Sequence, residues 1–187
     1  MKHKKILAVV LACTLTGCVF ASVLATIEKW EPTFAQGFAD VMAILQEDGV
    51  IKLGTQTVIN TYAAKITADF GELGSDVTAA RASSSAATGA LNKTIADLGS
   101  IEGDLTQLNG AIPGLSIPPM DIQDAQQSLS LLALAVSGFQ TELTPVAALP
   151  PEQMKAALKK AKLPKVEDFK KQWNLIQVSN HRPEKQL

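Results

Sequence analysis

The sequence predicts an all-α fold, an antiparallel helical bundle with one long central helix. Apolar residues recur every 3.6 positions between residues 58 and 112, which is the period of a straight α-helix. A second apolar run, over residues 122–143, follows a strict heptad. Hydrophobic residues make up 47% of the chain but aromatic residues only 5%, so the core must consist mainly of small aliphatic side chains that helices accommodate well. No segment alternates between apolar and polar residues as a half-buried strand would.

The first helix of the predicted bundle lies between residues 27 and 45. Gly49 is expected to end it. Pro32 lies inside the pattern and predicts either a kink or a helix whose first turn begins near Glu31. The apolar face consists of Ile27, Trp30, Phe34, Phe38, Val41 and Leu45.

The long central helix is expected over residues 51–109, as a rod of roughly 90 Å at 1.5 Å per residue. Gly71 and Gly74 allow an alternative, because two glycines cost about 2 kcal/mol relative to alanine in a helix. The rod would then divide into two segments, the second capped by Asp76. Small residues over 79–90 predict close packing against a neighbouring helix, and we expect no internal sequence repeat. The apolar stripe comprises Val58, Tyr62, Ile66, Phe70, Leu73, Val77, Ala80, Ala87, Leu91, Ile95, Leu98, Ile101, Leu105, Leu108 and Ile112, with Ser84 as its polar member.

The heptad helix follows a proline-rich connection, Gly110 to Pro119. Asp121 is expected to cap this helix, and Pro145, Pro150 and Pro151 are expected to end it. Its apolar face consists of Ile122, Ala125, Leu129, Leu132, Val136, Phe139 and Leu143.

Two short helices are expected after the heptad helix. The first covers residues 152–162, and Pro164 separates it from the second. The chain from Ser179 onward is expected to be disordered. The second helix is marked by Val166, Phe169, Trp173 and Ile176.

The N-terminus has the order of features typical of an export leader. A basic segment, Met1 to Lys5, precedes the uncharged apolar run Ile6 to Leu15. The run closes with Leu15-Thr16-Gly17-Cys18, which resembles the lipobox of bacterial lipoproteins. The resemblance implies that residues 1–17 are a signal peptide and that Cys18 becomes the acylated N-terminus. It also implies outer-membrane sorting where the host has such a membrane, because Val19 replaces the aspartate associated with inner-membrane retention.

Two other outcomes are compatible with this N-terminus. The uncharged run continues to Ile27, and its 22 residues are long enough to span a bilayer of about 30 Å as an uncleaved anchor. Ordinary secretory cleavage after Ala21 or Ala25 is the third possibility. The first two place the bulk of the chain on the exported side of the membrane.

Charge divides the rest of the chain into a helical body, residues 18–150, and a basic tail, residues 151–187. Residues 22–150 contain five Lys or Arg and fourteen Asp or Glu, a net charge of −9, whereas residues 151–187 contain nine and four, a net of +5. Either the tail packs on the body with its lysines in water, or it contacts an anionic surface. The candidate contact residues are Lys155, Lys159, Lys160, Lys162, Lys165, Lys170, Lys171 and Trp173.

The residues that chemistry requires are scarce, so we expect no catalysis, no cofactor and no metal site. Cys13 would leave with the leader and Cys18 would be acylated, so no free thiol would remain. His181, in the expected disordered tail, is the single histidine outside the leader. Nucleophilic catalysis needs a positioned base and zinc needs converging His or Cys, and neither can be assembled. Nucleic acid is not an expected partner of an exported protein.

The most consistent function is a lipid-anchored envelope protein with a structural or interaction role. Its expected partners are the membrane, through Cys18, and a second copy or another envelope protein. In outline it resembles the helical murein lipoprotein, but it ends in Lys185-Gln186-Leu187 and lacks that family's C-terminal lysine. Alternatives are a membrane-active helical protein, such as a phage lysis lipoprotein or a pore former, and a helical module that binds a hydrophobic ligand.

Overall fold

A computed structural model describes the backbone of residues 2–46, 53–82 and 87–187. Side chains are described in these ranges except at 2–19, 53–56, 80–82, 87, 88 and 151. The described residues form six α-helices and no strand, which confirms the all-α antiparallel bundle. The helices are α1 (Lys2–Gln46), α2 (Leu53–Ala82), α3 (Ala87–Ala111), α4 (Pro119–Ala147), α5 (Pro151–Leu158) and α6 (Val166–Ser179), with short 3-10 turns η1 (Ile112–Gly114) and η2 (Pro183–Lys185).

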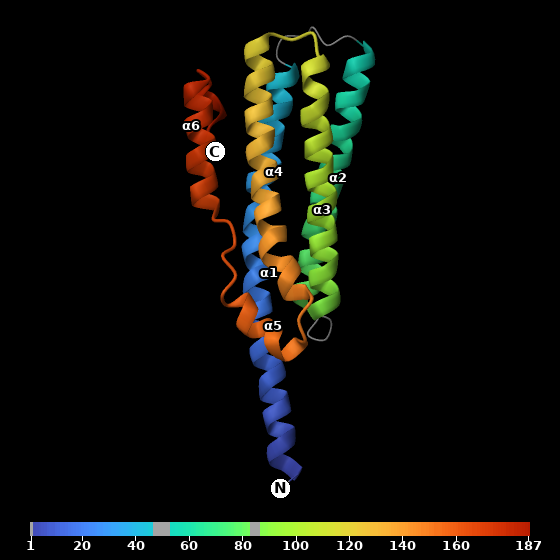
Figure 1. Cartoon of the computed structure of the whole chain (residues 1–187), viewed down its shortest axis with the longest axis vertical. Coiled ribbons are helices and arrows are strands. Elements are labelled where there is room, and N and C mark those ends of the chain that lie inside the picture. Colours follow the sequence, from blue (N-terminus) through green and yellow to red (C-terminus); the bar gives the residue numbers. More distant parts are fainter. Residues whose placement is uncertain (1, 47–52, 83–86) are drawn as a thin grey trace.

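Helices α1 to α4 form a four-helix bundle in which each helix packs on the next and α4 returns to pack on α1 (Figure 1). Helix α5 lies against α1 and α4, at the end of the bundle from which the N-terminal part of α1 projects. Helix α6 runs along the outside and contacts α4 and α1. The basic tail is therefore packed on the body.

The expected apolar faces form the core. All six residues of the first predicted face are buried, as are six of the seven heptad positions, with Ile122 half-buried. The stripe on α2 and α3 is also largely buried, whereas Val58 at its start is 43% exposed. Helix α4 is the one described helix long and apolar enough to cross a membrane, and its apolar face is part of this core.

Six of the nine aromatic rings form one cluster that ties α1, α2, α4 and α6 together. The ring centroid of Trp30 lies 4.9 Å from that of Phe34 and 5.1 Å from that of Phe169. Phe139 meets Trp30 edge-on at 5.6 Å, and Phe34 stacks on Phe70 at 5.4 Å. Aromatic pairs at these distances add about 0.5–1.5 kcal/mol each beyond the burial of their surface.

The expectation of one rod over residues 51–109 is wrong, because α2 and α3 lie side by side. Contacts join Tyr62 to Gln107, Lys65 to Asp104 and Asp76 to Lys93. The two residue numbers of each pair add to 169, so the numbers rise along α2 as they fall along α3. The two helices are therefore antiparallel, and the chain reverses its direction between Ala82 and Ala87. Ser84 of the stripe lies outside the described residues.

The alternative break at Gly71 and Gly74 is also wrong, because both glycines lie within α2. Asp76 therefore caps no helix. Close packing explains the glycine at position 74. A Cβ there would lie only 2.8 Å from the carboxylate of Glu31, which extends from α1 toward α2.

Prolines interrupt the helices less than expected. Pro32 lies inside α1, so no helix begins near Glu31. Pro145 lies inside α4, which continues to Ala147. Helix α4 begins at Pro119 with Pro118 as its N-cap, and Asp121 pairs with Arg182 instead of capping the helix. Gly49 lies outside the described residues.

The chain after Ser179 is ordered, contrary to the expectation of disorder. The Trp173 indole Nε1–H donates to the carbonyl of Lys185 at 2.8 Å. The backbone N–H of Leu187 donates to Asn174 Oδ1 at 2.8 Å. The polar composition of this segment predicted disorder, but its polar groups form the hydrogen bonds that hold it against α6.

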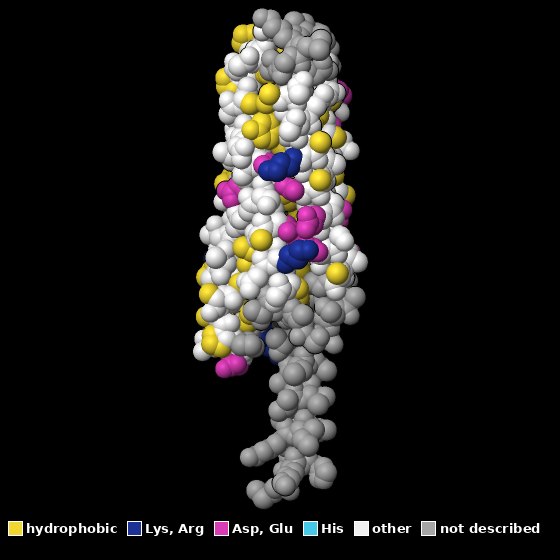
Figure 2. Space-filling view, turned by 90° about the vertical axis from the view of Figure 1, so that its right-hand side faces the viewer, with side chains coloured by type: hydrophobic (Ala, Val, Ile, Leu, Met, Phe, Trp, Pro, Cys, Tyr) yellow, Lys and Arg dark blue, Asp and Glu magenta, His cyan; other side chains and the backbone are white. Residues whose placement is uncertain are grey.

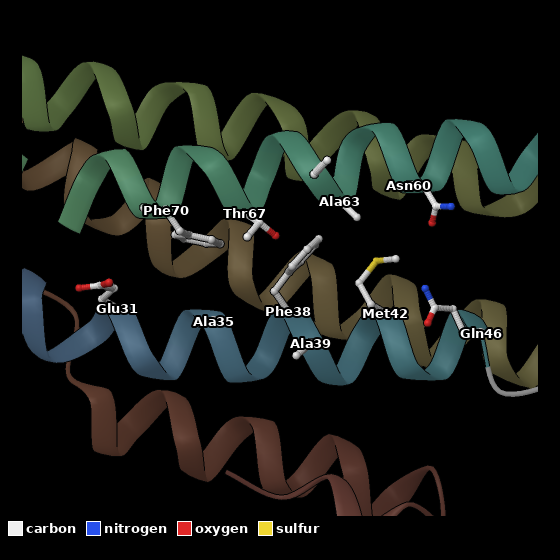
Figure 3. A pocket seen from close by; sticks show the side chains of 12 residues that line it. Glu31, Ala35, Phe38, Ala39, Met42, Gln46, Asn60, Ala63, Thr67 and Phe70 are labelled. Carbon is white, nitrogen blue, oxygen red and sulfur yellow. The ribbon is translucent and has the colours of Figure 1, made fainter. Parts of the chain in front are cut away.

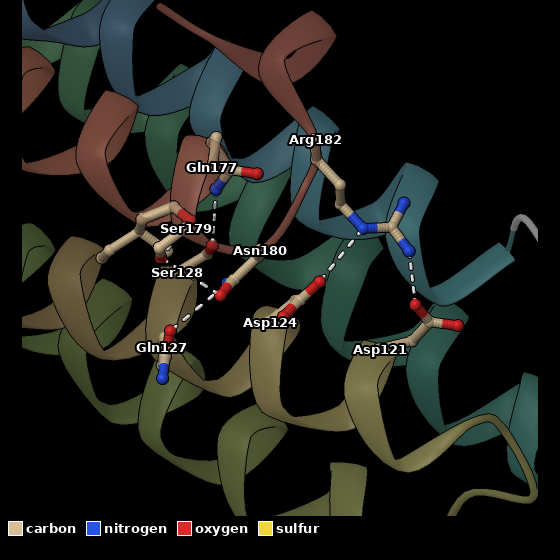
Figure 4. A network of polar contacts seen from close by, with 9 residues as sticks. Asp121, Asp124, Gln127, Ser128, Gln177, Ser179, Asn180 and Arg182 are labelled. Atoms are coloured by element: carbon tan, nitrogen blue, oxygen red, sulfur yellow. Dashed lines mark hydrogen bonds and ion pairs between the residues drawn. The ribbon is translucent and has the colours of Figure 1, made fainter.

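A polar network joins this C-terminal segment to α4 (Figure 4). Arg182 forms ion pairs with Asp121 and with Asp124, the latter at 3.1 Å. Gln177 Nε2 donates to Ser128 Oγ at 3.0 Å, with both side chains fully buried. These contacts anchor α6 to the body through groups that hydropathy alone would place in solvent.

Candidate functional site

A hollow with a basic lining lies at the end of the bundle where α1 enters it. Its walls are residues 22–30 of α1 and residues 158–167, which join α5 to α6, and its volume is about 830 Å³. Four exposed lysines line this basic hollow, Lys29, Lys159, Lys162 and Lys165.

The basic hollow owes its position to the packing of α5. Met154 and Leu158 are buried at 2% and 4% exposure, as is Phe20 on α1 at 4%. After Leu158 the chain cannot continue as a helix through Pro164, whose carbonyl accepts a hydrogen bond from Trp30 Nε1 at 3.1 Å. The backbone N–H of Lys162 donates to Glu142 Oε2 at 2.7 Å. The connector, and the lysines on it, are thereby fixed against α1 and α4.

The electrostatic character of the basic hollow is strongly positive. Its lining has four ammonium groups and one carboxylate, Glu167. Among the described residues, none of the four lysines forms an ion pair. Positive charges without an ion-pair partner on two separate segments of the chain are suited to an anion larger than a single carboxylate.

The lysines predicted from the sequence fall into two groups, those that line the basic hollow and those that do not. Lys159, Lys162 and Lys165 line the basic hollow, and Lys29 of α1, which the sequence pattern did not single out, joins them. The remaining lysines lie outside its lining, with Lys155 and Lys170 half-buried and Lys160 and Lys171 exposed.

Trp173 does not belong to a surface site. Its side chain is 0% exposed, and its ring lies 3.3 Å from the position a Cβ on Gly37 would take. Phe169 and Trp173 are both used for packing of α6 on the body, so Trp173 cannot meet a membrane. The Cys18 side chain lies outside the described side chains.

A second polar feature lies on α2 and α3, which Figure 2 shows as two groups of lysine and acidic side chains on one face. In the first group Lys65 Nζ contacts Asp104 Oδ1 at 2.5 Å, and Asp104 faces Asp69. In the second, Lys93 Nζ lies 2.7 Å from Asp76 Oδ2. Asp76 faces Asp97 there, as Asp104 faces Asp69 in the first group.

These two groups arise from a sequence repeat, so the expectation of no repeat is wrong. Residues 65–78 align with residues 93–106 at a constant offset of 28, and six of the fourteen positions are identical. The identical pairs are Lys65 and Lys93, Ala68 and Ala96, Asp69 and Asp97, Gly71 and Gly99, Asp76 and Asp104, and Thr78 and Thr106.

Each carboxylate pair is arranged to share a proton. Burial, followed by the hydrogen bond and the like charge of the facing Asp76, raises the pKa of Asp97 to about 6. Burial, followed by the hydrogen bond and charge of Asp104, also raises the pKa of Asp69. Oδ2 of Asp69, of Asp97 and of Asp104 is buried without a hydrogen-bond partner, which a shared proton would supply.

The second group also contains the described residues best placed to hold a metal ion, Glu72, Asp76 and Asp97. Their nearest oxygens lie within 4.8 Å of one another. The Lys93 ammonium lies 2.7 Å from Asp76 and 3.6 Å from Glu72, so a cationic group of the chain already occupies this position. We therefore assign no metal here.

Because the folded state holds these shared protons, we expect the free energy of unfolding to fall as the pH rises from about 4 through 6. The folded-state pKa of Asp97 lies above the ordinary value of 3.8 for an aspartate, so its contribution to stability is complete below about pH 4 and is lost as the pH passes about 6. We expect the loss to be about 1–2 kcal/mol, since Asp97 is partly exposed. Chemical denaturation at a series of pH values measures it. Asp97→Asn should flatten this part of the curve, and an unchanged slope in the variant would contradict the shared proton.

An apolar groove of about 730 Å³ lies between α1 and α2 (Figure 3). Phe38, Met42 and Phe70 point into it, and alanines on both helices leave room between them. Its charged and amide groups lie at the ends, Glu31 at one and Gln46 with Asn60 at the other, and the Thr67 hydroxyl lies between them. Helix α6, by contrast, packs on α1 and α4, and so covers a different side of α1.

Comparison of the chain with protein-family models, with curated proteins and with solved structures finds no match.

Proposed function

We propose that the protein is an exported lipoprotein, anchored through Cys18, whose helical bundle has a structural or interaction role at the cell envelope. The observation that best supports this is the burial of Phe20, Val23 and Leu24, which are 4%, 5% and 0% exposed. These residues follow Cys18 directly and belong to the bundle core. An apolar segment after the lipobox, where lipoproteins usually have a polar tether, thus has a role in folding.

The same burial disfavours the two alternatives for the N-terminus. Without the core residues from Phe20 onward, the uncharged run shortens to Ile6–Val19, which is 14 residues. A span of about 30 Å needs roughly 20, and 10–14 apolar residues are typical of a signal peptide. Cleavage after Ala25 would remove Phe20, Val23 and Leu24 from the core, and cleavage after Ala21 would remove Phe20.

The test of the anchor is metabolic labelling with radioactive palmitate. The wild-type protein should incorporate label and lose residues 1–17, whereas Cys18→Ala should remain unlabelled and uncleaved. Cys13→Ala is the matched control, because it also removes a thiol from the leader and should be processed normally. Label in the Cys18→Ala protein, or none in the wild type, would refute the lipoprotein assignment.

A second function, binding of a hydrophobic ligand, is favoured by the groove between α1 and α2. Its volume of about 730 Å³ lies within the range of small-molecule sites, which are mostly apolar with a few polar groups. Lipid recovered from the purified bundle would favour this function over a purely structural one. For a membrane-active protein, the apolar face of α4 would have to leave the core, where Leu129, Leu132 and Val136 are fully buried.

A further inference from the structure

We propose that the basic hollow is a docking site for anionic phospholipid headgroups and holds this end of the bundle against the membrane that carries the anchor. This inference rests on the proposed anchoring at Cys18. It assigns the contact to Lys29, Lys159, Lys162 and Lys165, and it commits to a membrane surface as the occupant.

Position is the first argument. Ser22, the first residue of the hollow, lies four residues after Cys18, and at 1.5 Å per helical residue the two are about 6 Å apart along α1. The headgroup layer of a bilayer is about 5–8 Å thick on each side of the hydrocarbon core. Acyl chains on Cys18 would lie in the hydrocarbon, so the edge of the hollow at Ser22 would lie in the headgroup layer, with Lys29 about 16 Å from Cys18 along α1.

Charge complementarity is the second argument. The hollow has a net charge of +3 from four lysines and Glu167, whereas residues 22–150 have a net charge of −9. A surface of anionic lipid attracts the lysine-lined end and repels the acidic body. The charge distribution therefore orients the bundle with its long axis away from the membrane.

Availability is the third argument. The four lysines are exposed and form no ion pair among the described residues. Lys65 and Lys93, by contrast, are paired with aspartates on the neighbouring helix. The connector is fixed by the bonds to Trp30 and Glu142, so little conformational freedom is lost when the lysines meet phosphates.

The test uses the lipidated full chain bound to vesicles of neutral lipid or of neutral lipid mixed with anionic phosphatidylglycerol. An amine-acylating reagent followed by mass spectrometry reports the modification rate of each lysine. In anionic vesicles we expect Lys29, Lys159, Lys162 and Lys165 to react about fivefold more slowly than in neutral ones, because each lysine near such a surface gains about a factor of five. Lys170 and Lys171 serve as internal controls with unchanged rates. Raising the salt to 1 M should remove the protection, since the screening length falls to about 3 Å.

Two double variants with equal charge change sharpen the test. Lys159→Glu with Lys162→Glu should abolish the protection of Lys29 and Lys165, whereas Lys170→Glu with Lys171→Glu should leave it intact. Equal rates in the two vesicle types, with the chain still floating on both, would overturn the docking site and leave the anchor standing. A chain that floats with neither would overturn both proposals. Protection by inorganic phosphate in neutral vesicles would show a site for a free anion and overturn the membrane as occupant.

Discussion

Replacing Trp173 by alanine is expected to lower the free energy of unfolding by about 3–5 kcal/mol, the range for removing a large buried aromatic side chain. The indole is 0% exposed, packs against Gly37 and Phe169, and donates to the carbonyl of Lys185. The substitution leaves a cavity between α6 and the bundle and frees the C-terminal segment. Urea denaturation followed by circular dichroism measures the change.

The control is Leu175→Ala on the same helix, where the side chain is 63% exposed. Its effect should stay within about 0.5 kcal/mol, as is usual for surface substitutions. A loss under 1 kcal/mol for Trp173→Ala would show that α6 is not docked on the body. Trp173 fluorescence should also be blue-shifted without any membrane and unchanged when vesicles are added.

Replacing Arg182 by alanine is expected to lower the free energy of unfolding by about 2–4 kcal/mol at pH 7. The guanidinium pairs with Asp121 and Asp124, whose side chains are only 10% and 2% exposed. Burial raises the pKa of Asp124, and Arg182 opposes that rise through a hydrogen bond and its charge. Without the arginine the two carboxylates would remain buried and unpaired.

Protonation can relieve that loss, so the effect of Arg182→Ala should be smaller at pH 4.5 than at pH 8. Adding Asp124→Asn in the same chain should recover part of the stability, because it removes one uncompensated charge. Lys93→Ala is the matched control, since the side chains of Lys93 and Glu72 are 53% and 60% exposed and exposed pairs are worth at most about 1 kcal/mol. Equal losses for the two substitutions would contradict the role assigned to Arg182.

The buried faces could be predicted from the sequence because they depend only on local periodicity. Leu98, Leu105 and Leu132 occur in the expected stripes and are all fully buried. The reversal between Ala82 and Ala87 could not be predicted in the same way. The apolar stripe continues from Val77 to Leu91 in phase, since both helices of the hairpin turn the same face to one core.

The basic hollow was only partly visible in the sequence for a related reason. Lys159, Lys162 and Lys165 could be recognised as part of a basic tail, but Lys29 is about 130 residues away along the chain. After Pro164 the chain continues as α6 along the outside of the bundle, so Lys170 and Lys171 lie on α6 and away from the hollow. Trp173 looked like an amphipathic anchor because a buried indole and an interfacial one follow the same helical spacing.

The offset of 28 residues between the two lysine–aspartate groups gives the α2–α3 hairpin an approximate two-fold axis. Moving by +28 takes Lys65 and Asp69 of α2 onto α3, and moving by −28 takes Asp104 onto Asp76. The two lysine–aspartate contacts and the two facing aspartate pairs are then counterparts on opposite sides of the axis, whereas the contact of Tyr62 with Gln107 has no counterpart. A single copy of this helix would present both halves of each group, so two identical helices could pair with each other as a homodimer.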